Sequence, residues 1–454
     1  MEIKAFGILT LLVVLIIPFI TLRKHYIIMV FFSVFTATAA ININQGSFNI
    51  SIIPVHIIAA IFAIRIFLGI LKRGLIYKKN LWLGLFVIWS ALTVVFLAIV
   101  DDYIPSGLTV RRYFSGEGYD LVQFSTGNVT QLMYLLFGYL IYFVTVEFIM
   151  STKNPIKLVQ KTLATLIYAA CFICLIGIYE MVAKYLGLPF MTIFRNFTGV
   201  VEYTNYRISS VAHEPSMFAY FIIISVALCY FYGELSVREK LNQYNVFFLS
   251  FLILIGLFST STTFLLGFTV FLIFTLNYYV KKHKLNIFIS VKTYFSFTTI
   301  VLLSFWLLNI PFIREKTLGR AIETLSFNNF SGADRLEKVI HHLEAFQHSP
   351  LVGLGFGTAR SYDGFTTLLV NLGIIGFTFF LLFIISSIYR LNKISKVPIN
   401  NLSTIAKGLL VGFICWFAMF MIAVPEIYFI YIWILFALIE CISIISKTSE
   451  DSNK

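Results

Sequence analysis

Charged residues are scarce in this sequence. Asp, Glu, Lys and Arg make up 12% of its 454 residues, whereas soluble domains contain about 25%. Hydrophobic residues make up 59%, and long apolar runs recur from one end of the chain to the other. A run of roughly 20 apolar residues can cross a bilayer as a helix, and the polar–apolar alternation of a transmembrane β-barrel is missing. The composition argues against a soluble protein and predicts an all-α, polytopic transmembrane helical bundle.

The motifs of metal and nucleotide sites are missing as well. The sequence contains no His-Glu-x-x-His, no P-loop and no Cys/His spacing typical of zinc, so we expect no metal and no nucleotide cofactor. Cysteine is rare, and packing in apolar runs is the expected role of all five: Cys171, Cys174, Cys229, Cys415 and Cys441. The first apolar run has no small-residue cleavage site after it, and we expect it to be retained as a span.

Positive charge prevails, with a formal net charge of +13. The Lys and Arg residues are concentrated in short loops between apolar runs. That is the positive-inside pattern of membrane proteins, and we therefore expect no binding of nucleic acid. The basic loops that identify the expected cytoplasmic side are 72–79, 153–157, 238–240, 281–284 and 390–407. The loops on the opposite side are then 101–127, 187–213 and 311–365.

Thirteen apolar runs are candidate spans: 6–22, 26–44, 52–71, 81–100, 128–150, 159–186, 214–233, 246–259, 261–280, 291–310, 366–389, 408–424 and 427–446. Counting the first two as one crossing gives twelve spans and a cytoplasmic N-terminus. A hydroxyl-rich stretch at 259–263 interrupts one long apolar stretch. It predicts two short helices that meet at a break lining a cavity, the alternative being one tilted helix. We expect residues 1–454 to form a single integral membrane domain, with 311–365 inserted as its large extracytoplasmic loop.

Within this loop, residues 331–347 are predicted to form an amphipathic helix along the membrane surface. Ser331 and Asp334 match a capping box, and apolar residues recur at helical spacing. Three basic side chains share the polar face: Arg335, Lys338 and His342. This face is a candidate site for a lipid-linked phosphate.

A second group of polar residues stands directly before an apolar run. Arg207, His213 and Glu214 fall within eight positions. A guanidinium can hold a pyrophosphate through two parallel hydrogen bonds, and a Glu or His can accept a proton from a sugar hydroxyl. Pro215 fits a first helical turn, so the alternative is that Glu214 only favours the start of a helix.

Glycines mark the end of the large loop, in Gly353-Leu354-Gly355-Phe356-Gly357. They indicate either a tight turn into the next span or a backbone lying against a sugar or phosphate. No strand precedes them, which argues against a dinucleotide fingerprint. Arg360 and Asp363 follow, as site residues or as ordinary interfacial charges.

At these residues the chain resembles the O-antigen polymerase and ligase superfamily, specifically the Wzy-type polysaccharide polymerases. The matching pieces are Arg207 with 209–216, the glycines of 353–357 and the Gly-Ile-Ile-Gly at 373–376. A weaker piece is Gly-Asn-Val-Thr-Gln at 127–131. The order of elements matches along most of the chain, although the motifs themselves cover about a tenth of it.

The resemblance implies a metal-independent, inverting glycosyltransferase of the bacterial inner membrane whose active site faces the periplasm or cell exterior. Its substrates would be undecaprenyl-pyrophosphate-linked glycans, as donor and acceptor, and a chain-length regulator would be a partner protein. Glu214 or His213 would be the base, and Asp363 stands where the superfamily's ligases carry a His. The substrate-binding residues would be Arg207, Arg335, Arg360, His342, Lys338, Gly353, Gly355 and Gly357. A ligase and a flippase for lipid-linked oligosaccharide remain the alternatives.

Overall fold

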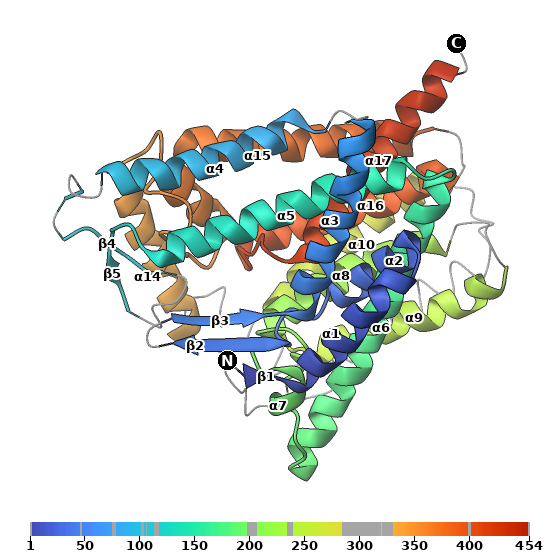
Figure 1. Cartoon of the computed structure of the whole chain (residues 1–454), viewed down its shortest axis with the longest axis horizontal. Helices are drawn as coiled ribbons and strands as arrows, with labels where there is room; N and C mark the ends of the chain where they lie inside the picture. The colour runs from blue at the N-terminus through green and yellow to red at the C-terminus, as the bar shows by residue number, and fades with distance from the viewer. Residues whose placement is uncertain are drawn as a thin grey trace.

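The computed structural model describes residues 2–45, 48–74, 79–100, 104–105, 107–112, 118–197, 207–233, 239–283, 319, 330–397 and 401–452. In this part of the chain the protein is an all-α bundle with two small antiparallel sheets (Figure 1). In these residues, eight helices are long and apolar enough to cross a membrane: α3 (Pro54–Arg73), α4 (Leu81–Val100), α5 (Thr126–Met150), α6 (Pro155–Leu186), α8 (Pro215–Tyr232), α15 (Gly364–Ser395), α16 (Asn401–Ile422) and α17 (Ile430–Ser452). The predicted polytopic membrane bundle is confirmed.

Shorter apolar helices account for three more of the predicted spans. They are α1 (Ala5–Ile16), which continues into the 3₁₀ turn η1 (Ile17–Phe19), α9 (Glu239–Phe258) and α10 (Thr262–His283). The predicted break between α9 and α10 is present, and Thr260 within it has a φ of 47°. The candidate span at 291–310 and most of the loop from 311 to 329 lie outside the described residues.

The predicted span at 26–44 is wrong. Helix α2 (Leu22–Phe32) ends early, and residues 33–40 follow as buried irregular chain. Strand β2 (Ile41–Gln45) comes next and pairs with β3 (Phe48–Ile52) and β1 (Glu2–Ile3). Alternating Ile and Asn in β2 favour a strand. The irregular backbone is tolerated inside the bundle because neighbouring segments satisfy its hydrogen bonds.

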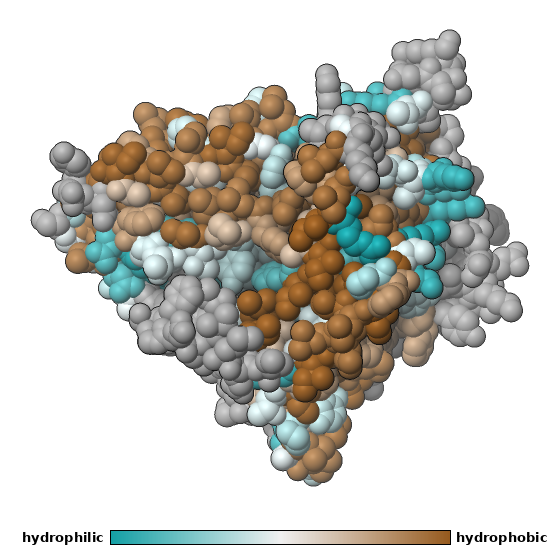
Figure 2. Space-filling model, viewed as in Figure 1, coloured by the Kyte–Doolittle hydropathy of each residue, from teal (hydrophilic) through white to brown (hydrophobic). Residues whose placement is uncertain are grey.

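Two helices form the centre of the bundle. Within an apolar stretch of 18 residues, 83% of α8 and 89% of α17 is buried, whereas in α4 the buried share is 39%. α8 and α17 are hydrophobic on all sides, as a helix surrounded by other helices must be. The outer faces of α4 and α15 instead expose large apolar side chains (Figure 2). Such a continuous apolar surface is typical of contact with lipid.

The basic loops gather at one end of the helices. There Lys79, before α4, pairs with Glu147 at the end of α5, and Arg390 on α15 pairs with Glu440 on α17 at 2.9 Å. The opposite end carries the strands β4 (Thr109–Val110) and β5 (Asp120–Leu121), and the helix α14 (Phe330–Phe346) (Figure 1). α14 confirms the helix expected at 331–347, although the side chains of its expected capping box lie outside the description.

The glycine-rich loop after α14 interlocks with a break in α15. Gly373 has a φ of 65° and a ψ of −173°, so the helix loses its own hydrogen bonds there. The loop replaces them: Ile374 N donates to Pro350 O (2.9 Å), and Leu354 N donates to Val370 O (2.7 Å). The break is therefore stabilised by the loop.

The loop glycines are fixed by packing. Gly353, Gly355 and Gly357 have φ values of 82°, 94° and 80°. A Cβ on Gly353 would lie 2.5 Å from the Asn371 backbone, and one on Gly357 would lie 2.7 Å from the Gln131 Cβ. These contacts explain the glycines as a tight turn into α15, which was the alternative to contact with substrate. They also bring three pieces of the resemblance together, at 127–131, 353–357 and 373–376.

We predict that Gly353→Ala destabilises the protein more than Gly74→Ala does. Both glycines have a positive φ, which costs a non-glycine residue about 1–3 kcal/mol. Only Gly353 lacks space for a Cβ, since nothing lies within 4 Å of that position at Gly74. The added clash costs about 1–3 kcal/mol. Thermal unfolding of the purified proteins in detergent measures the difference, and equal melting temperatures would contradict the interlocked loop.

Candidate active site

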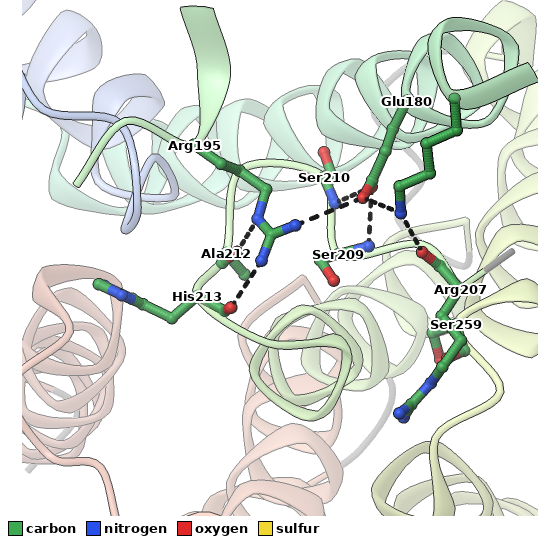
Figure 3. A network of polar contacts seen from close by, with 9 residues as sticks. Glu180, Arg195, Arg207, Ser209, Ser210, Ala212, His213 and Ser259 are labelled. Atoms are coloured by element: carbon green, nitrogen blue, oxygen red, sulfur yellow. Dashed lines mark hydrogen bonds and ion pairs between the residues drawn. The ribbon is translucent and has the colours of Figure 1, made fainter. Parts of the chain in front are cut away.

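One buried carboxylate holds the loop that precedes α8 (Figure 3). Glu180 on α6 is fully buried, and its Oε2 accepts hydrogen bonds from the backbone N–H groups of Ser209 (2.8 Å) and Ser210 (2.7 Å). Ser210 has a φ of 52°, and its hydroxyl donates to the carbonyl of Ile173 (2.6 Å). This left-handed conformation is costly for serine, and the three hydrogen bonds stabilise it. The path of the loop is therefore well defined.

Two cations neutralise Glu180. Lys184 Nζ lies 2.8 Å and Arg195 Nη1 lies 3.6 Å from its Oε1. Arg195 follows the short helix α7 (Met191–Phe194) and donates to the carbonyls of Ala212 (3.1 Å) and His213 (2.9 Å). A buried charge is strongly unfavourable without such partners. The network thus fixes the backbone on both sides of the loop.

His213 is held in its neutral form. Its Nε2 lies 2.9 Å from the carbonyl oxygen of Thr36, which can only accept, so Nε2 carries the proton. Thr36 belongs to the irregular segment that replaces the predicted span. Burial lowers the pKa of His213 to about 4, and the Arg360 guanidinium contributes to this shift. His213 is thus a weak base, and Nδ1 is its only nitrogen that can accept a proton.

Arg207 lies at the break between α9 and α10. Its Nε is 3.4 Å from the carbonyl of Ser259, and its own carbonyl accepts from Lys184 Nζ (3.1 Å). In Figure 3 its guanidinium points away from Glu180. The predicted hydroxyl-rich break therefore contacts a predicted substrate-binding arginine.

Glu214 occupies the N-cap position of α8, but its side chain caps no backbone N–H of that helix. It accepts instead from the hydroxyl of Ser216 (3.1 Å). Glu214 thus stands at the start of α8 without a side-chain cap bond, and the residue is partly exposed. Glu214 is also close enough to Glu426 to raise the pKa of that carboxyl group.

Glu426 joins the site from the loop between α16 and α17. It is completely buried and pairs with Arg360, whose side chain is 24% exposed. Burial raises the pKa of Glu426, and Arg360 lowers it in part. Within the described residues, Glu426 Oε2 accepts no well-formed hydrogen bond, although Tyr428 lies near. The pair thus combines a buried carboxylate with a guanidinium that reaches solvent.

A cluster of cations surrounds Tyr362, two residues from Arg360. Arg111, Arg335 and Lys338 lie 4.8, 5.1 and 5.2 Å from the centroid of its ring. The backbone links this cation cluster to the Glu426 pair, since Arg360 N donates to Arg111 O (2.8 Å). Cations at this distance from an aromatic face are attracted by it but repel one another. An anion bound among them would relieve that repulsion.

Two predicted site residues have structural roles. His342 is buried, donates from Nδ1 to the carbonyl of Lys338 and accepts at Nε2 from Arg111 N (3.3 Å), which joins α14 to the segment after β4. Asp363 accepts from Thr366 N (2.6 Å) and the Ser361 hydroxyl (2.8 Å), and caps α15. These contacts occupy both nitrogens of the imidazole and both oxygens of the carboxylate.

Eight of the eleven predicted site residues fall into three sets, while Arg207 lies at the break between α9 and α10 and His342 and Asp363 make the contacts described above. His213, Glu214 and Arg360 come together with Glu426, Arg335 and Lys338 come together at Tyr362, and the three glycines pack behind them. Sequence reasoning missed Glu426, Arg195 and Tyr362. The sequence did carry a signal for Glu426, because this carboxylate stands in the two-residue gap between the candidate spans 408–424 and 427–446.

The described residues contain no group of three or more His, Cys, Asp or Glu side chains arranged to bind a metal ion. A scan against protein-family models finds no match to the chain, and a search of curated proteins finds no relative. The function of this chain must therefore be inferred from the site itself and from the resemblance described above.

We predict that His213 makes stability fall as the pH is lowered. Its folded-state pKa of about 4 lies below the ordinary value near 6.5. The unfolded state therefore binds the proton more readily across that window, and stability is lost as the pH falls from about 6.5 toward 4. His213→Gln keeps a donor for Thr36 but cannot titrate. The melting temperature should drop less between pH 7.5 and pH 5.0 in this variant than in wild type. An identical drop in both proteins would contradict the assignment.

Proposed function

We propose that this chain is a metal-independent, inverting glycosyltransferase that polymerises undecaprenyl-pyrophosphate-linked oligosaccharide repeat units. The observation that carries the proposal is the convergence of His213, Glu214, Arg360 and Glu426, from three separate loops, at the end of the bundle opposite the basic loops. Carboxylates can accept a proton, and guanidiniums can bind a pyrophosphate. The resemblance to Wzy-type polymerases supports the same chemistry.

In the proposed reaction a hydroxyl oxygen of the acceptor sugar attacks the anomeric carbon of the donor. The new glycosidic bond forms with inversion as the bond from that carbon to the pyrophosphate oxygen breaks. The hydroxyl proton passes to a carboxylate of the site. Charge grows on the leaving pyrophosphate, and cations that neutralise it lower the barrier. Arg207, Arg335 and Arg360 are the cations we assign to this role, with Lys338 as a positioning charge.

The substrate class fits the surroundings of the site. A polyprenyl chain needs an apolar path, and the outer faces of α4 and α15 expose large apolar side chains. The positive-inside pattern puts the basic loops in the cytoplasm. The site then faces the periplasm or cell exterior of a bacterial inner membrane. There lipid-linked donor and acceptor units can meet, and a chain-length regulator can dock.

Deletion of the gene, scored for the length of surface glycan, tests the proposed function. Loss of a polymerase should leave single repeat units on an otherwise normal surface. Absence of any surface repeat would instead indicate a flippase, and accumulation of lipid-linked polymer would indicate a ligase. Either of these two outcomes contradicts the proposal.

We predict that Arg335→Lys lowers polymer yield roughly tenfold or more. An ammonium cannot make the planar two-point contact of a guanidinium, and a lost charge-assisted hydrogen bond costs about 1.5–3 kcal/mol. Lys338→Arg is the matched control, because it keeps the charge over the same Tyr362 ring. Glycan ladders normalised to membrane protein levels provide the measurement. Full-length polymer in both variants would remove Arg335 from the site.

A further inference from the structure

The two side chains of the Arg360–Glu426 ion pair differ in how far they are exposed to solvent. Glu426 is 0% exposed, and Arg360 is 24% exposed. The backbone that carries Glu426 is held in place, because Val424 N donates to Met419 O of α16 (3.0 Å), Glu426 N donates to Val424 O (2.8 Å) and Trp433 Nε1 donates to Ile427 O (2.8 Å). The guanidinium is on a long side chain that reaches the surface of the site. An incoming anion can therefore compete for Arg360 but cannot bring Glu426 with it.

Several titratable or charged groups face Glu426 from the elements packed around it: Arg360 before α15, Glu214 before α8, Tyr220 on α8, Tyr428 in its own loop and Tyr431 on α17. Arg360 is the cation among them. His213 lies close enough to Arg360 and Arg195 for both to lower its pKa, and it is neutral. The charge of Glu426 therefore depends chiefly on where the Arg360 guanidinium lies.

We propose that Glu426 is the group that takes the proton from the acceptor hydroxyl, and that Arg360 couples this transfer to departure of the pyrophosphate by moving from Glu426 to the leaving group. This inference rests on the proposed function and assigns the proton acceptor within it. Glu214, partly exposed and bonded to the Ser216 hydroxyl, is left to orient the acceptor sugar.

Before transfer, Glu426 is a carboxylate paired with Arg360. As the anomeric carbon–oxygen bond breaks, negative charge grows on the leaving pyrophosphate and draws the guanidinium away. A buried carboxylate without its cation binds a proton more tightly, and the hydroxyl loses its proton as its oxygen bonds to the anomeric carbon. Release of the polyprenyl pyrophosphate returns Arg360 to Glu426, which gives the proton to solvent.

A small cavity lies next to the loop that carries Glu426. Pro425, Ile427 and Tyr428 from this loop line it, together with Gln131 and Asn371. Gln131 on α5 packs on Gly357, and Asn371 on α15 accepts from Ala359 N, so both contact the interlocked loop. The buried Oε2 of Glu426 accepts no well-formed hydrogen bond from the described residues, although Tyr428 lies near enough to lower the pKa of this carboxyl group.

The product complex provides a test that does not require turnover. Farnesyl pyrophosphate carries the leaving group on a short polyprenyl chain. Its binding to the purified protein is measured by titration calorimetry near pH 7 in buffers of different ionisation enthalpy, which reports the protons taken up. Wild type should take up protons on binding, and Glu426→Gln should bind without this uptake. Infrared difference spectra of wild type should show a protonated carboxyl group appear on binding.

Glu440→Gln is the matched control. Glu440 forms a comparable Arg–Glu pair, with Arg390, at the opposite end of the bundle, and the two arginines are similarly exposed, at 21% and 24%. Its substitution should leave the uptake unchanged. Equal uptake in wild type and Glu426→Gln, no uptake in wild type, or no binding at all would overturn the inference. Loss of uptake in Glu214→Gln alone would also overturn it, by assigning the proton to Glu214.

These outcomes can be distinguished from a failure of the proposed function. The glycan phenotype of the deletion strain tests that function separately. A polymerase that binds farnesyl pyrophosphate without proton uptake keeps its function and loses this assignment. In polymerisation assays Glu426→Gln should lose about 10²–10⁴-fold in kcat with little change in KM, whereas Glu214→Gln should mainly raise KM.

Discussion

Buried carboxylates determine the structure at the site end of this bundle, because a charge removed from water must be paired or it destabilises the fold. Glu180 meets this constraint with two cations and two backbone N–H groups, and in doing so sets the path of the loop from Arg207 to His213. Glu426 meets it with Arg360, which comes from the far side of the site. The two carboxylates together bring the α6–α8, α14–α15 and α16–α17 connections into one place.

Breaks in otherwise helical segments provide the space for these polar groups. The irregular chain at 33–40 gives the carbonyl that binds His213, and the turn at 259–261 gives the carbonyl near Arg207. The break at Gly373 anchors the loop that delivers Arg360. Each break exposes backbone groups that need partners inside the bundle. These breaks gather polar groups at the site, whereas the Lys79–Glu147 and Arg390–Glu440 pairs lie at the end with the basic loops.

The sequence predicted the bundle well, since length and apolar composition alone decide whether a helix can cross a bilayer. Apolar helices coincide with eleven of the thirteen predicted spans, counting the eight long and three shorter helices of the described residues. The run at 26–44 failed because its composition is apolar enough for a helix, whereas pairing of β2 with β3 depends on contacts far along the chain. Arg207, His213, Glu214 and Arg360 could be selected as polar residues near span ends. Glu426 could have been selected in the same way, since it stands between two candidate spans. Its pairing with Arg360, and the contacts of Arg195 with Glu180 and the loop before α8, could not be predicted, because only tertiary packing brings those segments together. Asp363 caps α15 through Thr366 N, which is a local contact, whereas the contact of His342 with Arg111 N depends on tertiary packing.

Reconstitution of the purified chain tests the central claim, that this cluster of loops is the active site of a lipid-linked glycan polymerase. The protein would be placed in vesicles with undecaprenyl-pyrophosphate-linked repeat units and no nucleotide or metal, with chelator present. The account predicts a ladder of lipid-linked polymer and release of one undecaprenyl pyrophosphate for each linkage formed. Transfer of intact repeat units across the vesicle membrane, with no new linkage and no released pyrophosphate, would contradict it.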